Sequence, residues 1–105
     1  MDTDTPSLAF RPPHPGEILR EDILPALNMQ VKELANHLGV SRQSLSSLVH
    51  ERRAVSLDMA RRLGKAFRNG PRYWLALQTQ WEIWQEEQKN VPVNVLPLNW
   101  KTNAA

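Results

Sequence analysis

Residues 41–50, SRQSLSSLVH, carry a row of side chains that can form hydrogen bonds with bases and phosphates. Gln43 has an amide that can pair bidentately with adenine, and Arg42 can pair with guanine or with a phosphate. Ser46 and Ser47 are short, so their backbone can approach a groove closely and their hydroxyls can donate to oxygens there. This combination suits nucleic-acid recognition, although each of these residues alone is more often inert surface.

Further polar and basic residues flank this row and extend the same candidate surface. His50 ends the row, where it can contact a phosphate or act as a cation at a helix C-terminus. Arg52 and Arg53 follow in a polar connection, where phosphate contacts are expected. The full candidate set for DNA binding is Lys32, Ser41, Arg42, Gln43, Ser46, Ser47, His50, Arg52 and Arg53.

No other part of the chain has residues arranged for catalysis or for a bound metal. Glu17, Glu21 and Asp22 form a carboxylate cluster without a nearby histidine, and we interpret them as an exposed acidic face. The three histidines are far apart in the sequence and lack ligand spacing. The chain has no cysteine, no nucleophile motif and no phosphate-binding glycine loop. We therefore expect no enzyme activity, no metal and no cofactor.

The charge distribution points to a polyanion as partner. The 105 residues suffice for one domain and have a formal net charge of only +2. Residues 30–72, however, contain nine Lys or Arg and three Asp or Glu, between acidic flanks. Such a basic segment suggests nucleic acid, while a solvated surface is the commoner alternative for a charge cluster taken alone.

No apolar run approaches the ~20 residues of a membrane span, and the N-terminus lacks signal-peptide features. We expect a cytoplasmic protein with no membrane partner.

The elements that must position these side chains are predicted to be helices, because apolar residues recur at spacings of three and four. Ser41 is a good N-cap for the helix that carries the polar row. Gly39 ends the preceding helix, since glycine adopts positive φ at little cost. Pro25 should kink or shorten the first helix. The predicted helices lie within residues 14–28, 31–38, 41–50, 56–67 and about 71–89.

The predicted organisation is a single all-α domain between two irregular ends. Prolines make residues 1–13 a flexible N-terminal arm. Residues 14–89 form the helical domain, and no convincing pair of strands is present. Residues 90–105 form an irregular C-terminal tail with two prolines.

Residues 31–50 have the spacing of a helix-turn-helix. Ala35 is small where the two helices cross closely, and Gly39 makes the tight turn between them. Five apolar residues fill the wedge between the helices: Leu34, Leu38, Val40, Leu45 and Leu48. With that geometry the second helix projects and fits the major groove of B-DNA. The joint pattern favours DNA binding over an inert polar face.

Three segments together resemble a known family: HPGEILREDIL, then KELANHLGVSRQSLSSLVHERRAVSLDMARRLGKAF, then YWLALQTQWEIW. Over residues 14–88 the sequence is similar to the HigA-type antitoxins of the Xre/Cro helix-turn-helix repressor family. The resemblance implies a five-helix, lambda-repressor-like domain with extended terminal arms and a recognition helix at residues 41–50. It also implies a homodimer on double-stranded operator DNA in its own promoter. The implied protein partner is a HigB-like toxin, an mRNA-cleaving ribonuclease of the RelE-like fold.

One position departs from the family pattern. Gln30 precedes the second helix, where Ser or Thr is the common N-cap, while Glu33 keeps the other half of a capping box. We expect this change to weaken the cap by up to about 1 kcal/mol. Two alternatives stay open: a stand-alone Cro/Xre-type repressor without a toxin, and an interaction module whose helix-turn-helix no longer binds DNA.

Aromatic residues form one stripe along the last helix. Trp74, Leu77, Trp81 and Trp84 are spaced by three, four and three residues. Core packing is the favoured interpretation for Trp74 and Leu77. Trp81 and Trp84 lie farther along the helix, where we expect a homodimer or toxin contact. All four are candidates for a dimer or partner interface.

Overall fold

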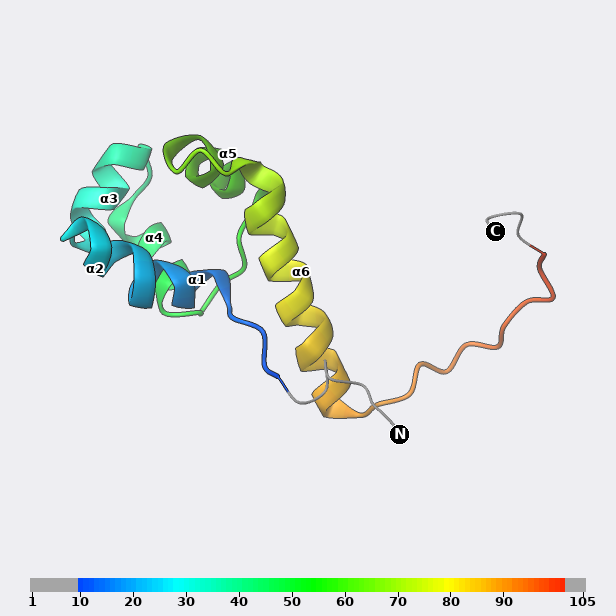
Figure 1. Ribbon diagram of the computed structural model, residues 1–105. Coiled ribbons are helices and arrows are strands. Elements are labelled where there is room, and N and C mark those ends of the chain that lie inside the picture. Colours follow the sequence, from blue (N-terminus) through cyan, green and yellow to red (C-terminus); the bar gives the residue numbers. More distant parts are fainter. Residues whose placement is uncertain (1–9, 102–105) are drawn as a thin grey trace.

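Helices form the packed part of the protein within the described residues. The computed structural model describes residues 10–101, and within this range there are five helical segments and no strand (Figure 1). The first segment is continuous and consists of α1, a π-helical turn η2, and α2. The bounds are α1 Pro15–Ile18, η2 Leu19–Ile23, α2 Leu24–Leu27, α3 Val31–Leu38, α4 Arg42–Val49, α5 Leu57–Ala66 and α6 Gly70–Lys89. The predicted all-α, five-helix fold is confirmed.

The first segment widens directly before Pro25. The Leu24 N–H donates to the Leu19 carbonyl, which is the five-residue spacing of a π turn. Pro25 has no N–H to donate and lies in the first turn of α2. The segment ends one turn later at Asn28, whose φ of 53° is left-handed. The disturbance predicted at Pro25 therefore takes the form of a π turn followed by a short last turn.

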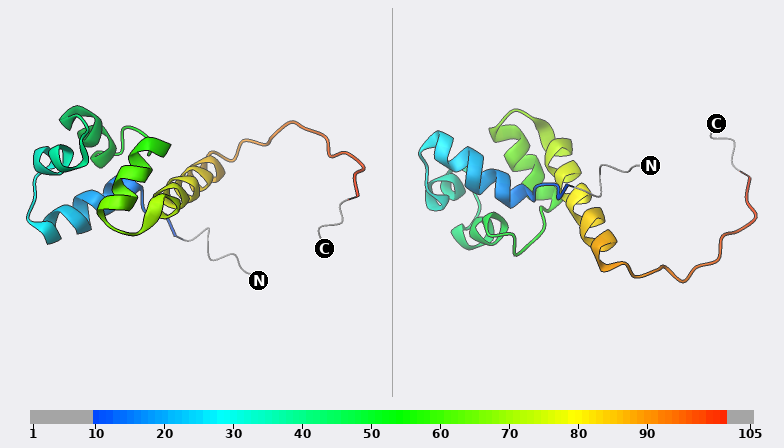
Figure 2. Two further views of the ribbon diagram at one scale, coloured as in Figure 1. Left: turned by 90° about the horizontal axis from the view of Figure 1, so that it is seen from above. Right: turned by 60° about the horizontal axis from the view of Figure 1, so that its bottom comes forward.

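The core lies where the apolar faces of all five segments meet. Trp74 of α6 and Leu19 of η2 are among its largest fully buried side chains. The remaining buried apolar residues are Leu24, Leu34, Ala35, Leu38, Leu45, Leu48, Val49, Val55, Met59, Ala60 and Leu63. α6 packs chiefly against α5, and its second half extends beyond the other helices (Figures 1 and 2). None of the helices in the described range is long and apolar enough to cross a membrane.

Two glycines set the positions of α3, α4 and α1. Gly39 follows α3 with a φ of 74°, which confirms the predicted glycine turn of the helix-turn-helix. Gly16 in α1 lies against the end of α4, where an added Cβ would be 1.9 Å from the Leu48 carbonyl oxygen. Only a residue without a side chain allows α1 and α4 to approach this closely.

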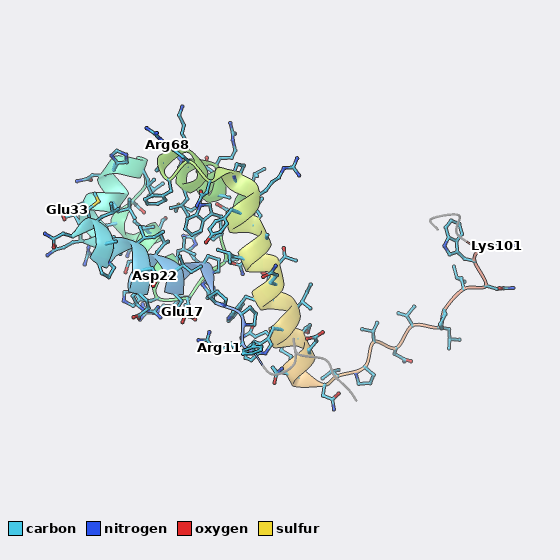
Figure 3. The ribbon with its side chains drawn as sticks, viewed as in Figure 1. Arg11, Glu17, Asp22, Glu33, Arg68 and Lys101 are labelled. Atoms are coloured by element: carbon cyan, nitrogen blue, oxygen red, sulfur yellow. The ribbon has the colours of Figure 1, made fainter. Side chains whose placement is uncertain are left out.

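The N-terminal end of the described chain runs along α6, and the C-terminal end runs away from it. Residues 10–14 are extended, and Arg11 lies beside the second half of α6 (Figure 3). α6 ends at Asn90 with a φ of 53°, and residues 90–101 form neither helix nor strand. Lys101 lies far from every helix (Figure 3). Of the predicted N-terminal arm, residues 1–9 fall outside the described range, as do residues 102–105 of the predicted tail.

Candidate nucleic-acid interface

α4 begins with a capped N-terminus and presents its polar side to solvent. The hydroxyl oxygen of Ser41 accepts the Ser44 N–H at 3.0 Å, which confirms Ser41 as the N-cap. Ser41, Arg42 and Gln43 are exposed, whereas Ser46 and Ser47 are half-buried. The exposed surface of α4 is therefore concentrated at its N-terminal end, the end that meets base edges in helix-turn-helix proteins.

The opposite side of α4 is locked into the core. Leu45, Leu48 and Val49 expose at most 1% of their surface. The packed side chains leave α4 little freedom to rotate, because core residues lie in close-packed contacts. The polar row is consequently held on a rigid helix rather than on a loop.

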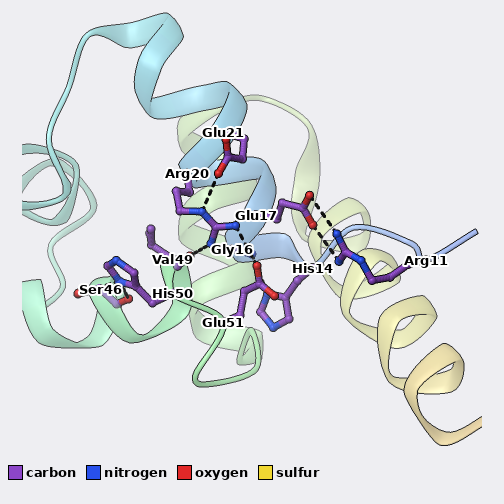
Figure 4. Close-up of polar contacts among 10 residues, drawn as sticks. All are labelled: Arg11, His14, Gly16, Glu17, Arg20, Glu21, Ser46, Val49, His50 and Glu51. Atoms are coloured by element: carbon purple, nitrogen blue, oxygen red, sulfur yellow. Dashed lines mark hydrogen bonds and ion pairs between the residues drawn. The ribbon is translucent and has the colours of Figure 1, made fainter. Parts of the chain in front are cut away.

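A side chain from the first helical segment holds the end of α4. Arg20 Nη1 donates to the Val49 carbonyl oxygen at 2.7 Å, and Arg20 Nη2 donates to Glu51 Oε2 at 3.0 Å (Figure 4). The carbonyls in the last turn of a helix have no partner within the helix, so this donor satisfies one of them. Sequence reasoning missed Arg20, because no local pattern relates it to a residue 29 positions away.

A second arginine holds the end of α3 in a similar way. Arg62 Nη1 donates to the Leu38 carbonyl oxygen at 2.7 Å and lies 3.3 Å from that of Gly39. Its Nε pairs with Asp58 at 2.9 Å, one turn earlier in α5. Arg62 belongs to the basic segment noted in the sequence, but it stabilises the turn between α3 and α4.

Four cations of the candidate set remain available at the surface. Lys32, Arg42, Arg52 and Arg53 are exposed. Within residues 10–101 none of the four takes part in an ion pair. One precedes α4 in the chain, one begins it and two follow it, and all are suited to contacts with phosphates, which fix the position of a protein on DNA.

His50 is turned back onto its own helix. Its Nδ1 donates to the Ser46 carbonyl oxygen at 2.9 Å, since a carbonyl can only accept. This contact supports the interpretation of His50 as a residue that interacts with the C-terminal end of its own helix, although the ring is exposed.

The start of α3 has the Glu33 half of a capping box. Glu33 Oε1 accepts the Gln30 N–H at 2.8 Å. That bond confirms the half of the capping box expected from Glu33.

The aromatic stripe of α6 divides into a buried part and a part at the surface. Trp74 is fully buried and donates from Nε1 to Asn69 Oδ1 at 2.9 Å. The favoured core-packing interpretation of Trp74 is therefore confirmed, and its buried ring is not accessible for an interface. Leu77 is half-buried against the core. Trp81 and Trp84 are also half-buried, and the His14 ring meets Trp81 edge-on with centroids 4.7 Å apart.

Two buried polar side chains have structural partners rather than solvent contacts. His14 caps α1, and its Nδ1 accepts the Gly16 N–H at 2.9 Å. Burial lowers the pKa of His14 below its ordinary value of 6.5, although the nearby Glu51 opposes this effect. Gln78 Oε1 accepts the Val55 N–H at 3.0 Å, joining α6 to the segment before α5.

The carboxylate cluster of the first helical segment is engaged in ion pairs. Glu17 pairs with Arg11 at 3.1 Å and Glu21 with Arg20 at 2.9 Å, while Asp22 is exposed. Within residues 10–101, no group of three or more His, Cys, Asp or Glu side chains is placed to hold a metal ion. The cluster therefore acts as a charged surface in this structure.

A capped, rigid second helix that follows a glycine turn defines a DNA-binding domain of the Cro/Xre helix-turn-helix class. The chain belongs to the helix-turn-helix family, whose model matches residues 19–74. Its relatives include HigA antitoxins, so the resemblance to HigA-type antitoxins of the Xre/Cro family is confirmed.

Three relatives illustrate the similarity. The crystal structure of an antidote protein of a plasmid maintenance system from Nostoc punctiforme is 42% identical, with a TM-score of 0.74 over 77% of this chain and 88% of that one. Pseudomonas aeruginosa antitoxin HigA, solved with the higBA promoter, is 35% identical, with a TM-score of 0.73 over 84% of this chain and 99% of that one. Vibrio cholerae antitoxin HigA-1 is 32% identical over 77% of this chain and 82% of its own length.

Proposed function

We propose that this protein is the antitoxin of a type II toxin–antitoxin module. It binds operator DNA as a dimer, represses its own operon and neutralises a HigB-like, mRNA-cleaving toxin of the RelE-like fold. Such a protein acts in the cytoplasm, where both operator and mRNA are found.

The observation that carries the DNA-binding part is the surface around α4. Its N-terminal end is exposed, its opposite side is buried, and the cations that bracket it have no carboxylate partner within residues 10–101. A fixed helix with free donors is the arrangement that major-groove recognition requires. The similarity to P. aeruginosa HigA, which was solved with the higBA promoter, supports operator binding by this chain.

Individual residues have distinct proposed roles. Gln43 and Arg42 read base edges from the exposed N-terminal end of α4. Ser41, Ser46 and Ser47 allow close approach and donate to phosphate or base oxygens. The remaining candidates contact the DNA backbone: Lys32, His50, Arg52 and Arg53.

The dimer is proposed to form through the surface part of the α6 stripe. Trp81 and Trp84 keep part of their rings accessible on a helix that extends beyond the core. Large aromatic side chains of this kind are enriched at protein interfaces. Leu77, half-buried beside them, is the inner edge of this surface. A two-fold dimer would place two α4 helices about 34 Å apart, so the operator should be an inverted repeat.

The toxin partner is supported by the similarity to HigA-1 of V. cholerae and to the Nostoc antidote protein. The alternative is a stand-alone Cro/Xre-type repressor without a toxin. Expressing the neighbouring reading frame with and without this chain separates the two. Growth arrest that this chain relieves supports the antitoxin, whereas a harmless neighbour favours the stand-alone repressor.

The decisive experiment for DNA binding is a titration of the purified protein against its own upstream DNA. Random DNA of equal length is the control, and both titrations are repeated at two salt concentrations. Tight, sequence-selective binding of two chains per site supports the dimeric autorepressor. Weak binding that is indifferent to sequence contradicts the proposed role of α4.

A further inference from the structure

The C-terminal tail contains a repeat that neither DNA binding nor the α6 contact uses. Residues 91–95 and 96–100 read VPVNV and LPLNW, so an apolar–Pro–apolar–Asn–apolar unit occurs twice. The backbone repeats as well. The Val95 N–H donates to the Val93 carbonyl at 2.9 Å, and the Trp100 N–H donates to the Leu98 carbonyl at 2.8 Å. Proline also restricts each preceding residue to extended conformations, so the segment has a defined shape.

This tail exposes an unusual amount of apolar surface. Six of its side chains are between 72% and 87% exposed: Val91, Val93, Val95, Leu96, Leu98 and Trp100. Single exposed apolar residues are ordinary, but a contiguous series of them indicates a contact with another surface. The tail runs away from all helices of its own chain (Figures 1 and 2).

An apolar groove lies near the point where the tail begins. It has a volume of about 380 Å³ and lies between the extended N-terminal residues and the second half of α6. Phe10 and Ile83 on its walls are 70% and 54% exposed. The lining residues are Phe10, Pro12, Gln80, Ile83, Trp84 and Glu87.

We propose that the tail of one copy lies in this groove of a second copy, with the unit LPLNW in contact with its apolar wall. The apolar side chains of the tail match Phe10, Ile83 and Trp84. The charges match as well, because Lys101 is the single charged residue of residues 90–101 and Glu87 is the single charged residue of the groove. The inference rests on the proposed dimer, because Trp84 lines the groove and also belongs to the proposed α6 dimer surface.

The shape of the tail favours a second copy over the groove of the same chain. The groove is lined by the last turns of α6, immediately before the left-handed residue Asn90. Occupying it from the same chain requires a sharp reversal, which Pro92 and Pro97 oppose by keeping Val91 and Leu96 extended. In a two-fold dimer each copy donates one tail and accepts one, so the contact is made twice.

Disulfide trapping tests the contact directly, because the chain has no cysteine of its own. Full-length Gln80→Cys and Asn99→Cys variants are mixed and exposed to oxidised glutathione, and the linked peptides are identified by mass spectrometry. The expected product joins the groove of one chain to the tail of another. The control is Asn99→Cys mixed with Lys65→Cys, whose cysteine lies at an exposed position of α5. The yield of the groove-to-tail product should be at least about tenfold higher than the yield of linked product in this control. Equal yields would overturn the proposal. So would a chain carrying both Gln80→Cys and Asn99→Cys that forms the link only within itself and never between two copies.

Sedimentation equilibrium of the full chain tests the contribution to assembly. Trp100→Ser and Ile83→Ser should each raise the dimer dissociation constant about tenfold, and combining them should add little, because both remove the same contact. Leu57→Ser, at a 62% exposed apolar position on α5, should leave the constant unchanged. If Trp100→Ser also leaves it unchanged, the tail inference fails and the proposed dimer stands. If the unaltered chain stays monomeric and binds its operator singly, the proposed dimer fails with it.

Discussion

The guanidinium of Arg20 and the backbone carbonyl of Val49 are joined by a 2.7 Å hydrogen bond across 29 residues of chain. The same guanidinium reaches Glu51, whose left-handed φ of 61° turns the chain away from α4. One side chain of the first helical segment thereby holds both the last turn of the recognition helix and the connection that carries Arg52 and Arg53. The position of the DNA-facing surface depends on a residue that we do not expect to contact DNA.

Replacing Arg20 with Gln should lower the free energy of unfolding by about 1–3 kcal/mol, because a partly buried carbonyl and carboxylate lose their charged donor. Urea denaturation measures the change. Arg11→Gln is the matched control, since Arg11 forms an exposed ion pair with Glu17 that should contribute at most about 1 kcal/mol. Equal losses in the two variants would contradict a special role for Arg20.

Gln43→Ala should weaken binding to the operator by about 1–3 kcal/mol and leave binding to random DNA unchanged. The amide is exposed at the N-terminal end of α4, where it can pair with a base edge but is not needed for folding. Parallel titrations on both DNAs measure the effect. An equal loss on random DNA would remove Gln43 from base reading.

Arg53→Ala should weaken binding to operator and random DNA alike. As a phosphate contact, Arg53 contributes to counterion release, so its loss should reduce the salt slope of the binding constant by about one. Titrations at several salt concentrations give that slope. Lys89→Ala is the control at an exposed cation near the end of α6, and an unchanged slope in Arg53→Ala would argue against a phosphate contact.

The stability of the protein should fall as the pH drops below about 6.5, and His14 should be one cause. Its pKa is lowered in the folded state, chiefly by burial, so the unfolded chain binds the proton more readily. The stability that His14 contributes is fully present above the pKa that it has in the unfolded chain. That contribution is lost as the pH falls towards the lower pKa that His14 has in the folded protein. A proton on Nδ1 would also remove the acceptor of the Gly16 N–H.

Urea titrations of the protein at pH 7.5 and pH 5.5 measure this loss of stability. His14→Asn is the matched variant, because asparagine keeps an N-cap acceptor and does not titrate. The variant should lose less stability between the two pH values than the unaltered chain. An identical loss in both proteins would assign the pH dependence to other groups.

Much of the helix-turn-helix was predictable from the sequence, because its determinants are local. The Ser41 cap, the turn at Gly39 and the apolar wedge of α3 and α4 depend on residues a few positions apart. Helix periodicity and capping are properties of short segments, so these features can be predicted without knowing the rest of the fold. The stripe on α6 was equally visible as a pattern.

Only the tertiary structure decided which members of these patterns are used for packing. Trp74 and Trp84 belong to the same stripe, yet the first is enclosed in the core and the second lines an open groove. Arg62 and Arg53 belong to the same basic segment, yet Arg62 donates a hydrogen bond to the Leu38 carbonyl at the end of α3. Arg20 has no local pattern that predicts its bond to Val49, and nothing near His14 predicts that its ring is buried against Trp81. Their roles arise where segments distant in the chain meet, and burial and hydrogen bonding there depend on the packing of the whole core.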